Sequence, residues 1–375
     1  MKSLQYLFLI ISFLMFNGIV NAQDEETSAL KNAQEAEQNK DIETALKWYK
    51  VVSKLQPNNA TYYYDIAWCN NELKQYEDAV KAARNGIRIM PSADLYKEEA
   101  YALLSLEKYE ESIVVYKKAL LLNKEDIESL KGIADAYYYL KDYINAEMYY
   151  LKNCALGNEN ATINYRLGYI KNETKKFEEA ILYFRKVVKR EDDYAEAYNE
   201  MGYAYDMLGQ NEEAIDNYLK AFNLNSQNEI YAANIASLYF NGKGLVNLDK
   251  SLAYYQKSLT IRDKNELSNY RVGWILNEKE KYEEALKYLQ RAVEIYPEFT
   301  AAWIDLGWAN LQLKNYKVAE NNLQKALKFD KSSDLAVYYL GQLFLEINKK
   351  EKAKKMLEKL KSMQSEYYDK LKEIL

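Results

Sequence analysis

The residue types that carry most enzyme chemistry are scarce in this chain. Its 375 residues include no His and two Cys. A Ser-His-Asp triad, a Cys-His dyad, a His-ligated zinc and a haem-His site are therefore impossible. The two cysteines, Cys69 and Cys154, cannot build a disulfide framework. We expect a protein that is not an enzyme and that holds no cofactor and no metal.

Paired carboxylates are the remaining candidates for acid–base chemistry. They recur as Glu110-Glu111, Glu178-Glu179 and Glu283-Glu284, each directly after an aromatic residue. If that aromatic residue opens a helix, the pair lies in the first turn, where the helix dipole favours negative charge. The repeated pairs then have a structural explanation, and we assign them no catalytic role.

The overall charge is mildly acidic. There are 51 basic and 56 acidic residues, and 49% of the chain is hydrophobic. This is an ordinary soluble composition with ample material for a core. Because no basic excess is present to attract a polyanion, we expect no binding of nucleic acid.

The first 22 residues have the pattern of a signal peptide. Lys2 is the only charge before Asp24, and the apolar run LQYLFLIISFLMFNGIV lies between them. Small or β-branched residues at Val20 and Ala22 suit cleavage before Gln23. We expect residues 1–22 to be removed, leaving an exported, periplasmic or secreted protein with no transmembrane segment. The alternative is an uncleaved N-terminal anchor.

The rest of the chain repeats with a period near 34 residues. One series of small residues closes strings such as QYEDA, KFEEA and KYEEA, and a second lies mostly twelve residues earlier. A third series, four residues after the first, is large and apolar at nine of its ten positions. The second series, which we call the crossing residues, consists of Ala33, Ala67, Ala100, Ala134, Gly168, Gly202, Ala236, Gly273, Gly307 and Gly341.

These series indicate pairs of amphipathic helices. Two helices approach closely only where their side chains are small, and the bulky third series fills the space beside that contact. Aromatic residues such as Tyr76, Tyr109, Tyr143, Tyr282 and Tyr316 are expected to open the second helix of each pair.

This pattern resembles the tetratricopeptide repeat (TPR) family, including its closing prolines Pro57, Pro91 and Pro297. The resemblance implies an all-α fold, a superhelical α-α solenoid of about ten helix hairpins over residues 23–361. The seventh unit, at about 229–265, is three residues longer. It resembles a Sel1-type repeat, in which Gly242 and Gly244 make a looser turn.

Residues 362–375 are expected to extend the last helix. No Gly or Pro follows Gly341, and apolar residues continue to Ile374 at steps of three or four. This extension is predicted to cap the exposed end of the stack, because terminal repeats need a cover. A short coiled-coil dimer seam is the alternative, and the oligomeric state stays open.

The resemblance places the first helix of each unit on the concave side. The residue after each crossing residue then faces the groove, and six of these ten are Trp or Tyr. Residues four before and three after share that face. The predicted partner-binding residues are Tyr64, Trp68, Asn71, Tyr101, Tyr165, Tyr169, Asn172, Tyr203, Tyr270, Trp274, Asn277 and Trp308. The alternative is that these rings only pack between repeats.

We therefore predict an exported scaffold that binds a protein or peptide segment in an aromatic-lined groove. Glu72, Glu173 and Glu278 on the same face favour neutral or basic partner segments. A carboxylate clamp is not expected, because Lys97 and Lys131 are followed four residues later by Tyr101 and Asp135 rather than Asn. The alternatives are a glycan- or polysaccharide-binding protein of the cell envelope, and a subunit that accompanies an enzyme.

Overall fold

A computed structural model describes residues 24–375 of the chain. The predicted signal peptide thus lies outside the described residues. From residue 24 onward the structure contains helices and no strands, and it contains no helix with the length and apolar character of a membrane span.

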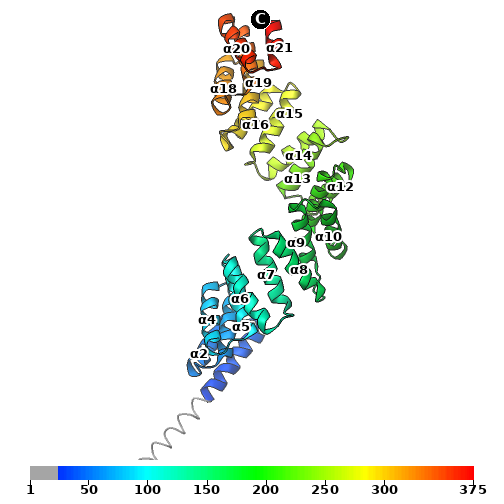
Figure 1. Cartoon of the computed structure of the whole chain (residues 1–375). Coiled ribbons are helices and arrows are strands. Elements are labelled where there is room, and N and C mark those ends of the chain that lie inside the picture. The colour runs from blue at the N-terminus through cyan, green and yellow to red at the C-terminus, as the bar shows by residue number, and fades with distance from the viewer. Residues whose placement is uncertain (1–23) are drawn as a thin grey trace, which may run out of the picture. The chain divides into compact units, whose positions relative to one another are not determined.

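A first helix over 24–38 is followed by twenty more, seen in order in Figure 1. Their bounds are α2 Ile42–Leu55, α3 Ala60–Glu72, α4 Tyr76–Ile89, α5 Ala93–Ser105, α6 Tyr109–Leu122, α7 Ile127–Tyr139, α8 Tyr143–Ala155, α9 Ala161–Glu173, α10 Phe177–Arg190, α11 Ala195–Met207, α12 Asn211–Leu224, α13 Glu229–Asn241, α14 Leu248–Ile261, α15 Glu266–Glu278, α16 Tyr282–Ile295, α17 Thr300–Gln312, α18 Tyr316–Phe329, α19 Asp334–Glu346, α20 Lys350–Ser362 and α21 Tyr367–Ile374.

Through α20 these helices form ten consecutive hairpins, which confirms the predicted fold class. Tyr76, Tyr109, Tyr143, Tyr282 and Tyr316 each open a second helix, as expected from the sequence. The described helices fall into two compact units, divided between Ile170 and Lys171 within α9.

The crossing residues act as the sequence indicates. Every Ala of that series has 0% of its surface exposed. A Cβ added to Gly273 would lie 2.5 Å from the side chain of Leu289, and one added to Gly307 would lie 2.6 Å from that of Leu323. In these repeats the small residue of the first helix is therefore covered by the bulky third-series residue of the same repeat.

The two helices of a hairpin begin differently. Many first helices have a side-chain cap: the Asp126 carboxylate, for example, accepts from the Ser129 N–H at 2.8 Å. Most second helices have no such cap, and several carry an acidic pair in the first turn instead. The carboxylate pairs thus lie where negative charge offsets the exposed N–H groups of the helix.

The turn inside most hairpins holds one residue in the left-handed region, seven positions after the crossing residue. At Gly209 this is a glycine with φ +71°. The same position in eight other repeats carries a side chain, with φ between 57° and 60°: Lys40, Lys74, Glu107, Lys141, Lys175, Glu280, Lys314 and Asn348. Such a conformation is costly for residues with a Cβ.

The seventh hairpin has the longer connection that the sequence predicted. Between α13 and α14 the chain runs through 242–247, with Gly244 at φ +81°. The Asn247 N–H closes this loop on the Tyr239 carbonyl at 2.8 Å. The likeness to a Sel1-type repeat stays a prediction.

The end of the chain differs from the prediction. The last hairpin helix does not extend to the C-terminus, because α20 ends at Ser362 and Gln364 turns the chain with φ 52°. The separate helix α21 returns to α19, where Tyr367 stacks on Tyr338 with ring centroids 5.0 Å apart. Leu371 is fully buried over Gly341. The capping helix is therefore a short helix of its own, and Met363, Tyr367 and Leu371 serve this contact within the chain, whereas Ile374 is exposed.

Candidate functional site

In part of each unit the first helices of consecutive repeats pack directly on one another. In the first unit α3 contacts α5 and α5 contacts α7, and in the second unit α15 contacts α17 and α17 contacts α19. Second helices in turn contact the first helix of the next repeat, as α4 contacts α5 and α16 contacts α17. We call the surface that the first helices form within each unit the first-helix face.

The first-helix face of the first unit contains a cleft of about 340 Å³. It lies over α3, α5 and α7, and its rings come from Trp68, Tyr101 and Tyr116. Its charged side chains are Glu72, Lys97, Glu98, Glu128, Lys131 and Asp135. Three of the twelve predicted site residues, Trp68, Asn71 and Tyr101, thus line one cleft.

Both lysines of this cleft are bound by carboxylates. The Nζ of Lys97 lies 2.9 Å from Glu128, 3.1 Å from Asp94 and 3.5 Å from Asp126. Burial alone would lower the pKa of Lys97, but the hydrogen bonds to these carboxylates raise it. Lys131 lies 2.6 Å from Asp135, and Asp135 also accepts a hydrogen bond from the Tyr150 hydroxyl.

The predicted rings differ in exposure. Tyr101 is 47% exposed and Tyr203 is 39% exposed. The other rings of the prediction are half-buried: Tyr64, Trp68, Tyr165, Tyr169, Tyr270, Trp274 and Trp308.

Several of these rings also pack on neighbouring aromatic side chains. Trp308 stacks on Tyr339 with centroids 4.6 Å apart. Trp274 meets Phe240 at 5.1 Å, edge to face. The more exposed Tyr101 has its partner Tyr76 at 6.4 Å. Packing between repeats is thus part of their role, and Tyr101 and Tyr203 keep the most surface for another molecule.

The three predicted asparagines are buried, although Asn71 belongs to the lining of the cleft. Asn71, Asn172 and Asn277 are buried, with 4%, 3% and 6% of their surface exposed. The Nδ2 of each donates to a backbone carbonyl of the next first helix at 3.1 Å, on Glu98, Glu200 and Asp305 respectively. Their expected role as exposed hydrogen-bond donors is corrected: the amide N–H groups join consecutive repeats.

The carboxyl groups of these same partner residues were not singled out from the sequence. Glu98, Glu200 and Asp305 each lie two residues before a crossing residue and are half-buried. Burial raises the pKa of Glu98, although Asn71 and Lys97 oppose the shift. Burial also raises the pKa of Glu200, and it raises that of Asp305 to about 7. The repeat pattern does not mark this position, because it is acidic in four of the ten repeats and basic in three.

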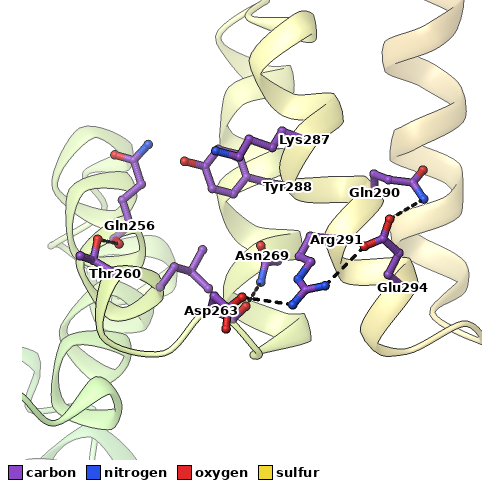
Figure 2. Close-up of a pocket in the computed structure, with 10 residues that line it drawn as sticks. Gln256, Thr260, Asp263, Asn269, Lys287, Tyr288, Gln290, Arg291 and Glu294 are labelled. Atoms are coloured by element: carbon purple, nitrogen blue, oxygen red, sulfur yellow. Dashed lines mark hydrogen bonds and ion pairs between the residues drawn. The ribbon is translucent and has the colours of Figure 1, made fainter.

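A larger cavity of about 550 Å³ lies in the second unit, outside the predicted groove. Figure 2 shows its lining from α14, α15 and α16, where Arg291 lies 3.1 Å from Asp263 and 3.5 Å from Glu294. The Asn269 amide donates to the Asp263 carbonyl at 2.9 Å. Many of its polar groups therefore satisfy one another.

The remaining candidates for chemistry are the two cysteines and groups of side chains that could hold a metal ion. Neither Cys69 nor Cys154 takes part in a disulfide. Cys69 is buried, and burial raises the pKa of its thiol to about 12, so it stays protonated and unreactive at neutral pH. Among residues 24–375, no three His, Cys, Asp or Glu side chains are grouped to hold a metal ion.

Comparison with known families agrees with this architecture. Models described as tetratricopeptide repeat match residues 93–126, 161–194, 183–216, 270–334 and 335–363. The chain belongs to the tetratricopeptide repeat family.

Relatives share the repeat rather than the whole protein. Small glutamine-rich tetratricopeptide repeat-containing protein 2 of Saccharomyces cerevisiae is 37% identical over 102 residues, which is 25% of this chain and 30% of that protein. TPR repeat-containing protein MJ1428 of Methanocaldococcus jannaschii is 24% identical over 255 residues, 65% of this chain and 44% of that protein. The chain thus spans less than half the length of these curated relatives.

A solved structure shows the same fold. It is the C-terminal part of a TPR repeat-containing protein from Cytophaga hutchinsonii, with a TM-score of 0.54 at 15% identity. The match covers 64% of this chain and 97% of that structure. TPR proteins typically bind other proteins, so the first-helix face is the surface on which to look for a partner.

Proposed function

We propose that this TPR protein is an exported, non-enzymatic scaffold that binds an extended segment of a partner polypeptide along its first-helix face. The cleft over α3, α5 and α7 is the observation that carries this proposal. It combines rings that can cover partner side chains with carboxylates that can accept from a partner backbone.

Tyr101 and Tyr203 are the best places to test binding, because their rings are exposed. Covering one large ring is worth about 1.5–3 kcal/mol, so each should matter for affinity. Trp274 and Trp308 are poorer test positions, since they also pack on Phe240 and Tyr339 and their removal would loosen the repeats.

The test uses a photo-crosslinking amino acid at Tyr101, at Tyr203 and at the exposed Lys81 on second helix α4. In the native cell we expect one polypeptide to crosslink from the two tyrosine positions and not from Lys81. Tyr101→Ala and Tyr203→Ala should then weaken binding of that polypeptide about tenfold each. The matched control is Tyr296→Ala, which removes a ring that is also 47% exposed but lies at the end of second helix α16.

Crosslinking that is equal at all three positions would contradict the proposal. Binding of a purified cell-envelope polysaccharide that depends on Tyr101 and Tyr203, with no polypeptide crosslinked, would establish the glycan-binding alternative instead. The proposed export is tested separately by the N-terminal sequence of the mature protein, which should begin at Gln23.

A further inference from the structure

The cleft over α3, α5 and α7 contains a carboxylate without a counter-ion. Glu98 is half-buried and lines the cleft together with Trp68 and Tyr101. Among residues 24–375 no Lys or Arg nitrogen lies within 4.0 Å of its carboxylate, which accepts from the Asn71 amide at 2.7 Å. We call Trp68, Asn71, Glu98 and Tyr101 the Glu98 site.

The same site holds an unsatisfied hydrogen-bond acceptor. The Oδ1 of Asn71 is buried and has no donor within the described residues, although its Nδ2 is bonded. A buried acceptor left without a donor is costly. The Asn71 oxygen is enclosed, so the Glu98 carboxylate is the one of these two groups that a cationic donor of another molecule can reach.

The lysines of the cleft do not meet this need. Lys97 is held by Asp94, Asp126 and Glu128, and Lys131 is held by Asp135. The cleft is lined by four carboxylates and two lysines, so the charge left over is negative. Of these four carboxylates the exposed Glu72, like Glu98, has no ion-pair partner among the described residues.

We propose that the Glu98 site binds a cationic side chain, lysine or arginine, of the partner segment. The Glu98 carboxylate is its counter-ion, and the rings of Trp68 and Tyr101 cover the aliphatic stem and face the cation. This inference rests on the proposed function, because it names the chemistry of the segment that the first-helix face binds.

The arrangement recurs in the second unit. The Asn172 amide reaches the Glu200 carboxylate at 3.1 Å, with Tyr203 three residues further along α11. The Asn277 amide reaches the Asp305 backbone, with Trp308 three residues further along α17, but here the carboxyl group accepts a hydrogen bond from Tyr270. The Oδ1 of both asparagines is again buried without a donor. A partner with several cationic side chains fits this repetition.

The test monitors peptide binding at the Glu98 site by ¹⁹F NMR of the full chain labelled with 5-fluorotryptophan. The chain has five Trp, and the Trp68 resonance is assigned from Trp68→Phe. The probe is a hexapeptide with three lysines, compared with the same peptide carrying Nε-acetyllysine. We expect a saturable shift of the Trp68 resonance with the lysine peptide and at least tenfold weaker binding of the acetylated one.

Glu98→Gln keeps the size of the side chain and its acceptor for Asn71 while removing the charge. We expect it to weaken the lysine peptide about tenfold at the Trp68 resonance. Glu77→Gln, an exposed carboxylate on neighbouring α4, is the matched control and should change affinity less than twofold. Should Glu98→Gln disturb the other four Trp resonances, Tyr101→Ala replaces it, with a several-fold loss expected.

Equal responses to the lysine and acetyllysine peptides, or unchanged binding by Glu98→Gln, would overturn the inference. So would a Trp68 response to a neutral oligosaccharide such as cellohexaose but not to the lysine peptide. The two proposals fail separately. The proposed function fails if crosslinking finds no polypeptide while the Trp68 resonance still reports the lysine peptide. The inference alone fails if a polypeptide is crosslinked but its binding is unchanged by Glu98→Gln.

Discussion

Two aspartates on first helices keep their carboxyl groups in unusual surroundings. Burial raises the pKa of Asp65 to about 7, and the nearby Glu37 adds to the shift. Burial likewise raises the pKa of Asp305 to about 7, although a hydrogen bond from Tyr270 opposes it. Each group therefore binds a proton more tightly in the folded chain than in the unfolded chain.

This predicts a stability that falls as pH rises. A carboxyl with a raised pKa stabilises the fold fully below its unfolded pKa near 3.9, and the contribution is lost as pH rises to about 7. Asp305→Asn should therefore raise the free energy of unfolding at pH 8 by an amount on the order of 2 kcal/mol and flatten its decline between pH 4 and 7.

The measurement is urea unfolding of the full chain at several pH values. The control is Glu358→Gln on α20, which removes an exposed carboxylate and should leave the pH profile unchanged. This prediction would be contradicted if the free energy of unfolding of Asp305→Asn fell with pH as steeply as that of the wild type.

Individual side chains show how far the sequence could locate the site. Helical spacing placed Trp68, Asn71 and Tyr101 on one face, and all three line one cleft. It did not show that Asn71 is buried, because depth depends on the distance to the next first helix, and that distance comes from packing between repeats. For the same reason the spacing could not show that Glu98 lacks a counter-ion.

Among the elements, the hairpin turns carry a repeated strain. Lys141 adopts φ 59° where the equivalent residue of the sixth hairpin is Gly209. Left-handed backbone costs a residue with a Cβ about 1–2 kcal/mol. Lys141→Gly should therefore stabilise the chain by about 0.5–1 kcal/mol, the gain being reduced by the greater freedom of glycine in the unfolded chain.

The reverse change is its matched control. Nothing lies within 4 Å of a Cβ placed on Gly209, so Gly209→Ala adds only the backbone cost and should destabilise by about 1 kcal/mol. Thermal unfolding of the two variants measures both changes in stability. Shifts of the same sign would show that something other than backbone strain controls these turns.

The same elements show what sequence pattern can predict. Repeat period and crossing residues placed the ten hairpins and the start of many second helices, because small and bulky side chains must alternate at a close helix contact. The end of α20 was missed because no Gly or Pro marks it, and Gln364 takes the left-handed turn instead.

At the scale of the whole molecule, each repeat contacts only its neighbours, so it is stabilised only by the repeats beside it. The helix α21 closes the last one: Leu371 covers Gly341, and the Ser365 hydroxyl donates to Asp334 at 2.8 Å. Ending the chain after Ser362 should therefore loosen α19 and α20 first. Losing the buried Leu371 alone is expected to cost about 2–5 kcal/mol locally.

Amide hydrogen exchange measures the local loosening of α19 and α20 directly. Protection of α19 and α20 should drop in the truncated chain, while protection of α3 to α6 stays as in the full chain. A full chain with Lys372→Ala, an exposed change on α21, should keep the original protection everywhere. A uniform loss along the chain would show that its repeats unfold as one.

The lack of histidine gives the carboxyl groups of Asp65 and Asp305 a distinctive consequence. In most proteins, proton exchange with the buffer near neutrality is attributed first to imidazole, and here no imidazole contributes. Whatever docks beside Asp305 and favours its ionised form must expel a proton into solution. Titration calorimetry in buffers of different ionisation enthalpy would register that release as a heat that changes with the buffer.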